Sequence, residues 1–172
     1  MPATYGATLF FDDGSRHAVG SLYLGATVDA EEDGRISADS TADPSDDGVS
    51  ITNDDAWLIG TQRDLNITVT GGTGYLVGWI DWDRNATFDV PTDTVDFGTV
   101  SAGAQTVTVT IHDSFDTFSD DPLVARFRLF PISTPQMKSL HGAATNGEVE
   151  DYVWEVPTLR YYFPVLYGAA SR

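Results

Sequence analysis

The residues with the clearest chemistry in this chain form an alternating series of oxygen-bearing side chains directly after an apolar strand. From Gly78 the sequence reads GWIDWDRNATFD, and every second residue of its polar part carries oxygen: Asp81, Asp83, Asn85, Thr87 and Asp89. Calcium takes oxygen ligands from the first, third, fifth, seventh and ninth places of a binding loop, the seventh through its backbone carbonyl. The series therefore predicts a calcium site made by these five residues.

Two positions of this loop depart from the calcium-binding pattern. Ala86 stands at the sixth place, where the sharp turn prefers glycine, and Thr92 stands at the twelfth, where a glutamate normally binds with both oxygens. An acid from elsewhere would have to complete the site, and the candidates are Glu148, Glu150 and Asp151. A polar turn without any metal is the alternative interpretation.

A second set of acids lies in residues 29–55, the least hydrophobic part of the chain. Its candidate ligands stand at the start (Asp29, Glu31 and Asp33) and toward the end (Asp46 and Asp47). A segment this polar cannot offset its ordering entropy by apolar burial, so it stays loose unless something else fixes it. The two alternatives are a solvated loop and a loop ordered by a second cation site.

The charge and composition narrow the classes of partner. Nine basic and 26 acidic residues give a net charge of −17, which argues against binding to nucleic acid or to an anionic membrane and favours cations. No apolar run approaches the roughly 18 residues of a membrane helix, so we expect no membrane insertion. The first ten residues lack the basic start of a signal peptide, so a secreted protein would be a mature or trimmed form.

Catalytic signatures are weak. Cysteine is absent, which removes disulfides, thiolate metal sites and a cysteine nucleophile. The three histidines, His17, His112 and His141, are scattered, and no serine elbow or phosphate-binding glycine loop is present. Pairs of acids are expected by chance in a chain this acidic. We therefore expect no enzyme, and we interpret His17 as a hydrogen-bonded structural residue.

Strands, not helices, are expected to position these residues. Alternation with period two marks residues 65–70 and 106–111, which indicates half-buried strands. Further strands are predicted at 8–11, 21–24, 49–52, 56–60, 75–82, 123–130, 149–156 and 160–167. The predicted fold is all-β, an antiparallel, jelly-roll-like β-sandwich with long acidic loops, formed by one domain over residues 1–156.

Side-chain pairing across the predicted strands can also be anticipated. Arg126 and Arg128 share one strand face, and we expect them to pair with Glu148 and Glu150 of a neighbouring strand. Among the tryptophans, Trp79 and Trp154 are expected in the sandwich interior. Trp82 lies between two aspartates and is expected nearer the surface, where an aromatic face could stack on a sugar ring.

The last segment, residues 157–172, is apolar and β-prone. Tyr161, Tyr162, Phe163, Val165, Leu166 and Tyr167 supply its apolar side chains, while Pro164 confines it to an edge or a break between strands. It forms either the last strand of its own sandwich or a strand donated to a neighbouring subunit. Head-to-tail donation that does not close on itself would generate a filament.

Several short motifs occur in a recognisable order. They are Tyr5-Gly6-Ala7-Thr8, Arg16-His17, Leu22-Tyr23-Leu24-Gly25, VDAEEDG at 28–34, Asp46-Asp47-Gly48-Val49, GWIDWD at 78–83, Ala125-Arg126-Phe127-Arg128 and Gly147-Glu148-Val149-Glu150-Asp151. In this order the chain resembles the GEVED domain of bacterial secreted and surface proteins over about residues 4–154. The family usually has an Asn-Asp-Gly or Asp-Gly step in this loop, where this chain has Arg84-Asn85-Ala86.

The resemblance implies a β-sandwich module without catalytic activity in a large extracellular or cell-surface protein, and it favours calcium as the bound ion. We therefore expect a structural or adhesive module that could self-assemble through its C-terminal strand and contact other surface proteins or glycans. The alternative is a carbohydrate-binding module of a larger secreted protein.

Overall fold

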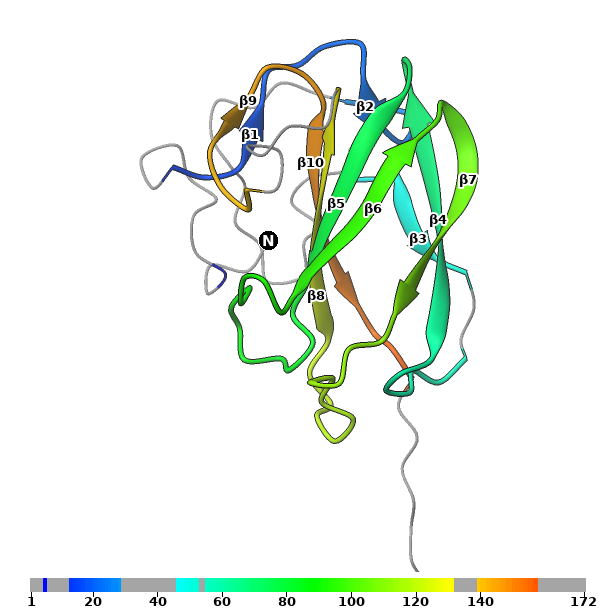
Figure 1. Ribbon diagram of the computed structural model, residues 1–172, viewed down its shortest axis with the longest axis vertical. Coiled ribbons are helices and arrows are strands. Elements are labelled where there is room, and N and C mark those ends of the chain that lie inside the picture. Colours follow the sequence, from blue (N-terminus) through cyan, green and yellow to red (C-terminus); the bar gives the residue numbers. More distant parts are fainter. Residues whose placement is uncertain (1–4, 6–12, 29–45, 53–54, 132–138, 158–172) are drawn as a thin grey trace, which may run out of the picture.

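The computed structural model describes residues 5, 13–28, 46–52, 55–131 and 139–157 (Figure 1). Three predicted ligands, Asp29, Glu31 and Asp33, lie outside the described residues, as do the predicted strands at 8–11 and 160–167. All regular structure in the described part of the chain is β-strand, as the alternating sequence predicts. Within that part there is no helix long and apolar enough to cross a membrane.

The described strands are β1 (Arg16–His17), β2 (Tyr23–Leu24), β3 (Val49–Ile51), β4 (Gln62–Thr70), β5 (Gly74–Ile80), β6 (Thr94–Val100), β7 (Gly103–Thr110), β8 (Leu123–Phe130), β9 (Ala143–Ala144) and β10 (Glu148–Trp154). The predicted strand at 123–130 matches β8 in full. The prediction at 56–60 is wrong, because only Trp57 forms a bridge there and residues 59–60 make a turn.

Two antiparallel sheets form the sandwich (Figure 1). The first has the strand order β10-β8-β5-β6. In the second, β4 pairs with β7 along one side and with β2 and β3 along the other. A short parallel pair, β1 with β9, stands apart from both sheets. The predicted all-β sandwich is confirmed.

The main core lies between the two sheets. Strand β4 follows the predicted alternation, since Leu65, Ile67 and Val69 are buried while Asn66 is exposed. These side chains belong to the same cluster as Leu76 of β5 and others from β8. Each strand thereby places one apolar face toward the opposite sheet, which is the arrangement of a β-sandwich.

Strand β8 lies inside the first sheet and is covered on both faces, so all eight of its residues are buried. The outer face of this sheet carries a second apolar cluster that includes Val77, Trp79 and Leu140. In the strand register, Arg126 lies opposite Trp79, and Arg128 lies opposite Val77, on this same outer face. The β1–β9 pair and the loop after β5 cover that face, so the sheet supports the candidate site from below.

The expectation that Trp82 lies near the surface is wrong. Its side chain is 1% exposed. The backbone carbonyl of Trp82 accepts a hydrogen bond from the N–H of Asp116 (2.9 Å), which folds residues 112–116 over the indole. Trp57 and Phe115 pack against it with ring centroids at 6.3 and 6.4 Å. Trp154 joins the same inter-sheet core, whereas Trp79 belongs to the outer cluster.

Candidate functional site

Asp81 is the first residue after β5, and its carboxylate organises the loop that follows. The residue is 0% exposed. Its oxygens accept hydrogen bonds from the backbone N–H groups of Asn85 (3.1 Å) and Ala86 (3.0 Å). The hydroxyl of Tyr5 donates a third bond of 2.5 Å. Burial raises the pKa of Asp81 above its ordinary value, against the stabilising effect of these donors.

The loop adopts two left-handed backbone conformations. Ala86, at the sixth place of the calcium pattern, has φ = 67°, and Arg84 has φ = 55°. Glycine is preferred at the sixth place because it tolerates such an angle, so Ala86 departs from the pattern in residue type but not in backbone shape. The Arg84 guanidinium donates to the carbonyls of Asp116 (2.9 Å) and Ser119 (2.7 Å), which fixes this turn.

Three of the predicted ligands converge on the surface of this loop. The amide nitrogen of Asn85 donates to Oδ2 of Asp83 (3.1 Å) and to Oδ2 of Asp89 (2.9 Å). The amide oxygen of Asn85 accepts the backbone N–H (2.9 Å) and the hydroxyl (2.6 Å) of Thr87. All four residues are exposed. The loop therefore holds two carboxylates around one amide, within reach of solvent ions.

Asp93, which the sequence pattern did not select, closes the far end of the loop. It is 1% exposed and accepts the backbone N–H of Asp89 (2.7 Å). Its own backbone carbonyl accepts the N–H of Ile80 (3.0 Å), which joins the two ends of the loop. Burial raises the pKa of Asp93 to about 6. The sequence signal for Asp93 was its position, directly before β6 and four residues after Asp89.

The donor set of this loop fits a calcium ion in part. Calcium takes six to eight oxygen ligands, and the side chains of Asp83, Asn85 and Asp89 with the carbonyl of Thr87 would supply some of them. The Asp81 carboxylate is already occupied by three donors. Among the described residues, no three His, Cys, Asp or Glu side chains are grouped so as to hold a metal. Water or acids from the undescribed parts would have to complete the shell.

The acids proposed to complete the loop contact other groups. Glu148 accepts the backbone N–H of Leu24 (2.7 Å). Glu150, which is 0% exposed, accepts the N–H groups of Asp47 (3.1 Å) and Gly48 (2.9 Å) with one oxygen and the Tyr152 hydroxyl (3.0 Å) with the other. Burial raises the pKa of Glu150 to about 7. These two glutamates thus fasten the chain on both sides of the acidic segment 29–45 to β10.

The described acids of the second predicted site lie at this attachment. Asp47 is exposed, and its Oδ1 accepts the backbone N–H of Ala26 (3.0 Å), while Asp46 is half-buried. The neighbouring charge of Asp47 contributes to the raised pKa of Glu150, after burial. Residues on either side of the acidic segment are therefore held within one hydrogen-bonded group.

Glycine is required at position 147, the first residue of the run 147–151. Gly147 has φ = 101°, and a Cβ atom there would overlap the carbonyl of Leu129. Only glycine combines that backbone angle with so close an approach. The run from 147 to 151 therefore carries a backbone constraint, two glutamates that hold the acidic segment, and an aspartate that faces the other side of the sheet.

The expected pairing of Arg126 and Arg128 with Glu148 and Glu150 is wrong. The glutamates face Leu129 and Phe127 in the register, whereas the arginines face Asp151 and Val149 on the outer side. Arg126 instead binds both oxygens of Asp151, at 2.8 and 2.9 Å. The two arginines share one face of β8, as their alternation predicts, but in the register with β10 this face meets Asp151 and not the glutamates.

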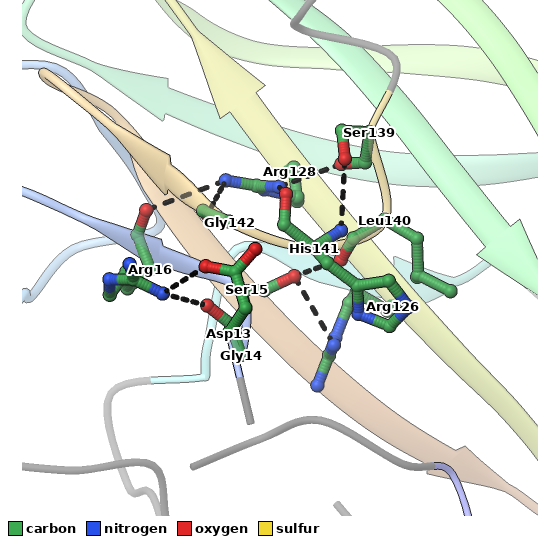
Figure 2. A network of polar contacts seen from close by, with 10 residues as sticks. All are labelled: Asp13, Gly14, Ser15, Arg16, Arg126, Arg128, Ser139, Leu140, His141 and Gly142. Carbon is green, nitrogen blue, oxygen red and sulfur yellow. Dashed lines mark hydrogen bonds and ion pairs between the residues drawn. The ribbon is translucent and has the colours of Figure 1, made fainter. Parts of the chain in front are cut away.

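Arg128 is surrounded by backbone carbonyls (Figure 2). It donates to the carbonyls of Ser139 (2.7 Å), His141 (2.9 Å) and Gly142 (2.9 Å), which hold the chain before β9 against the sheet. Burial, followed by the nearby charge of Arg126, lowers its pKa to about 10. Arg128 also donates to Nε2 of His17 (3.2 Å). The guanidinium thus joins β1, β8 and β9.

His17 is a structural residue, as the sequence indicates. Its Nδ1 lies 2.6 Å from the carbonyl oxygen of Asn146, so that nitrogen carries the proton and Nε2 accepts from Arg128. Burial, then the charge of Arg128, lowers the pKa of His17 to about 4. The ring packs on Phe130 at 5.0 Å.

These contacts define a β-sandwich module whose polar residues shape loops and fasten segments to the sheets. The family model of the GEVED domain matches residues 75–155, from β5 through β10, so this part of the chain is similar to a GEVED domain. The match includes the loop after β5 and the run 147–151, but not β1 to β4. Comparisons with curated proteins and with solved structures gave no match.

Proposed function

We propose that this chain is a non-catalytic, calcium-binding structural or adhesive module of an extracellular or cell-surface protein of bacterial type. The observation that carries the proposal is the convergence of Asp83, Asn85 and Asp89 in a loop whose sixth residue has the left-handed angle of a calcium-binding turn. The predicted ligand series supplies the chemistry, and the net charge of −17 favours cation uptake.

Each loop residue would have a distinct part in holding the ion. Asp83 and Asp89 would bind through side-chain oxygens and Thr87 through its carbonyl. Asn85 would join them once its amide turns, because its nitrogen now faces the two carboxylates. Asp81 and Asp93 would keep the backbone in place, since both are buried and accept N–H groups of the loop. Two exposed carboxylates within hydrogen-bonding distance of one nitrogen repel each other, and a divalent cation supplies the compensating charge.

Calcium at this place would stabilise more than the loop itself. Tyr5 is bonded to Asp81 and packs on Phe88 at 5.0 Å, while Arg84 holds the carbonyls of residues 116 and 119. The ion would therefore tie together the N-terminal segment, the loop after β5 and the loop before β8. A module whose surface loops are fixed in this way is suited to a mechanical or adhesive role.

Calorimetric titration of the chelator-treated protein with calcium tests the proposal. Asp83→Asn and Asp89→Asn should each weaken binding at least tenfold. Asp113→Asn removes an exposed charge from the loop after β7 and should leave that affinity unchanged. Because an ion bound only by the folded form adds RT ln(1 + [L]/Kd), saturation at 100 times Kd should stabilise the fold by about 2.7 kcal/mol. Equal affinities in all four proteins would refute the assignment.

The second cation site, formed by Asp29, Glu31, Asp33, Asp46 and Asp47, remains part of the proposal as a sequence-based prediction. Only its last two residues are described, and they lie where Glu150 holds the chain. This site would add a second calcium ion to the titration. Its loss should follow substitution of Asp46 and Asp47 and not of Asp83.

The carbohydrate-binding alternative gains no support from the tryptophans. Trp57, Trp79, Trp82 and Trp154 are at most 8% exposed. A sugar ring stacks on an exposed aromatic face, and none of these indoles presents one. The residue on which the alternative depended, Trp82, belongs to the core.

Self-assembly through the C-terminal segment completes the proposed function. Residues 158–172 lie outside the described residues, but their sequence is apolar and β-prone. We propose that this segment joins copies of the module by strand addition, so that the protein forms filaments.

A further inference from the structure

The long side of β7 that faces away from β4 is an open sheet edge. Strand β7 pairs with β4 from Gly103 opposite Val69 to Thr110 opposite Gln62, and no other described strand pairs with it. Ile111 donates to the carbonyl of Thr61 (2.9 Å), so by the alternation of antiparallel pairs the N–H groups of Thr106 and Thr108 point away from β4. These groups are positioned to pair with an added strand.

The other sheet edges in the described part of the chain carry protective features. Strand β6 has a register shift at its pairing with β5, a glycine at φ = 78° (Gly98) and a charge at Asp96. Strands β2 and β3 have only two and three residues. Strand β10 lies beside β1, and its glutamates hold residues 24 and 47–48. Such features are how proteins prevent edge-to-edge pairing.

Strand β7 lacks these features except for a left-handed glycine at its first residue, Gly103 (φ = 101°). Its eight residues, GAQTVTVT, include no charge and no proline, and its pairing with β4 has no register shift. Val107 is only half-buried, although it packs against the main core. Val95 and Phe97 of β6, the strand that leads into β7, are half-buried in the same cluster. A strand added at this side would cover apolar surface as well as pair the backbone.

The segment 158–172 has the length and charge for this edge. Fifteen residues extend to about 50 Å, whereas the eight residues of β7 span about 26 Å. The segment contains Arg160 and Arg172 and no acid, while the chain as a whole has a net charge of −17. An apolar, basic strand is therefore complementary to an acidic module with an uncharged open edge.

The described chain ends at one end of the sandwich, beside Trp57. The carbonyl of Pro157 accepts the N–H of Trp57 (2.8 Å), directly after β10. Strands β10 and β3 lie on one side of the sandwich, joined by the Glu150 to Gly48 and Tyr152 to Val49 bonds, and β6 and β7 lie on the other. The Trp57 segment is in turn bonded to the end of β7, through the N–H of Gly60 and the carbonyl of Ile111 (2.9 Å), so the edge of the same copy is also within reach and the oligomeric state decides between the two.

We propose that the open edge of β7 accepts residues 158–172 of a second copy of this chain. The inference rests on the self-assembly part of the proposed function and identifies its accepting surface. Because the donated segment and the accepting edge lie at different places, the contact is heterologous, and repetition extends the assembly into a filament. Calcium binding at the loop after β5 is a separate claim.

Light scattering of the full chain and of edge variants tests the proposal. Thr106→Pro removes an outward N–H, and Thr106→Lys places a charge on the edge. Thr99→Lys makes the same change on β6, the edge of the other sheet, and is the matched control. The full chain and Thr99→Lys should form species of several copies, whereas both Thr106 variants should fall to the 18.6 kDa monomer with an unchanged circular dichroism spectrum.

Cysteine cross-linking supplies a second measurement, because the chain contains no cysteine. Mixed Thr106→Cys and Tyr162→Cys proteins should form a disulfide-linked dimer, and Thr99→Cys mixed with Tyr162→Cys should not. Assembly that persists in both Thr106 variants, with no cross-link, would overturn the β7 assignment and leave self-assembly standing. A monomeric full chain would overturn self-assembly as well, and neither result would alter the calcium titration.

Discussion

Replacing Glu150 by alanine removes the acceptor that fastens the chain after the acidic segment to β10. Three donors lose their partner: the backbone N–H groups of Asp47 and Gly48 and the hydroxyl of Tyr152. Asp47 is exposed, so water can replace the carboxylate there, whereas Gly48 is buried. Leaving a buried donor unsatisfied costs about 1–3 kcal/mol. With the partly buried hydroxyl included, Glu150→Ala should destabilise the fold by about 2–3 kcal/mol.

Two further variants separate the lost acceptor from a general effect of substitution. Glu150→Gln keeps one oxygen for the N–H groups and a polar group for Tyr152, so its cost should stay below about 1 kcal/mol. Glu155→Ala removes an exposed glutamate just after β10 and should change stability by less than about 0.5 kcal/mol.

Urea unfolding at pH 7 measures these differences from the transition midpoints at constant slope. Amide hydrogen exchange adds a local test, because Gly48 and Val49 should exchange faster in Glu150→Ala while the amides of β5 and β8 keep their relative protection. If Glu150→Ala costs no more than Glu155→Ala, the carboxylate does not hold the segment, and the structural role given to the glutamates of the run 147–151 is wrong.

Three other predictions follow from the described contacts. The pKa of His17 is about 4 in the folded chain, against an ordinary value of 6.5, so the unfolded state binds the proton first as the pH falls. The free energy of unfolding should therefore drop by about 2 kcal/mol between pH 7 and 5 through this group. In urea unfolding, His17→Asn should show a drop smaller by that amount, and an equal drop would contradict the buried, neutral state of His17. Asp151→Leu leaves Arg126 buried without its carboxylate and should cost about 3 kcal/mol, most of which the double variant Arg126→Met with Asp151→Leu should recover. Strictly additive losses in the cycle formed by Arg126→Met, Asp151→Leu and the double variant would argue against a paired role. Trypsin should cut after Arg35, the one basic residue between positions 29 and 55, more slowly with calcium than with a chelator, and equal rates would count against the second cation site.

The sequence was sufficient for the fold class because alternation is a local property. Leu65, Ile67 and Val69 are buried on one face of β4 as their spacing predicts, and β8 has the predicted bounds. Strand existence depends on the residues within each segment, and those are visible in a single sequence. The order of strands in the two sheets depends on contacts between distant segments and could not be read from it.

The candidate site was predicted in its residue types but not in all of its roles. Asp83, Asn85 and Asp89 converge as their spacing indicates. Asp81 shares that spacing, yet it is buried beneath the loop, where Tyr5, 76 residues earlier, donates to it. Such a contact between distant residues leaves no periodic signal in the sequence.

The wrong predictions for Arg126, Arg128 and Trp82 share one physical cause. Arg126 and Arg128 were placed on the correct strand face, but their partners depend on which face of β10 they meet. Trp82 stands between two aspartates, and its burial follows from the loop at 112–116 that folds over it. In both cases tertiary packing decided what local sequence left open.

Terbium luminescence tests the central claim most directly, because terbium replaces calcium at oxygen sites and emits when a nearby indole is excited. Trp82 lies within the loop sequence, between Asp81 and Asp83. We expect sensitised emission in the native protein that calcium displaces, that Asp113→Asn retains and that Asp83→Asn and Asp89→Asn lose. Emission that is absent from the native protein, or that survives unchanged in both loop variants, would contradict calcium binding by this loop.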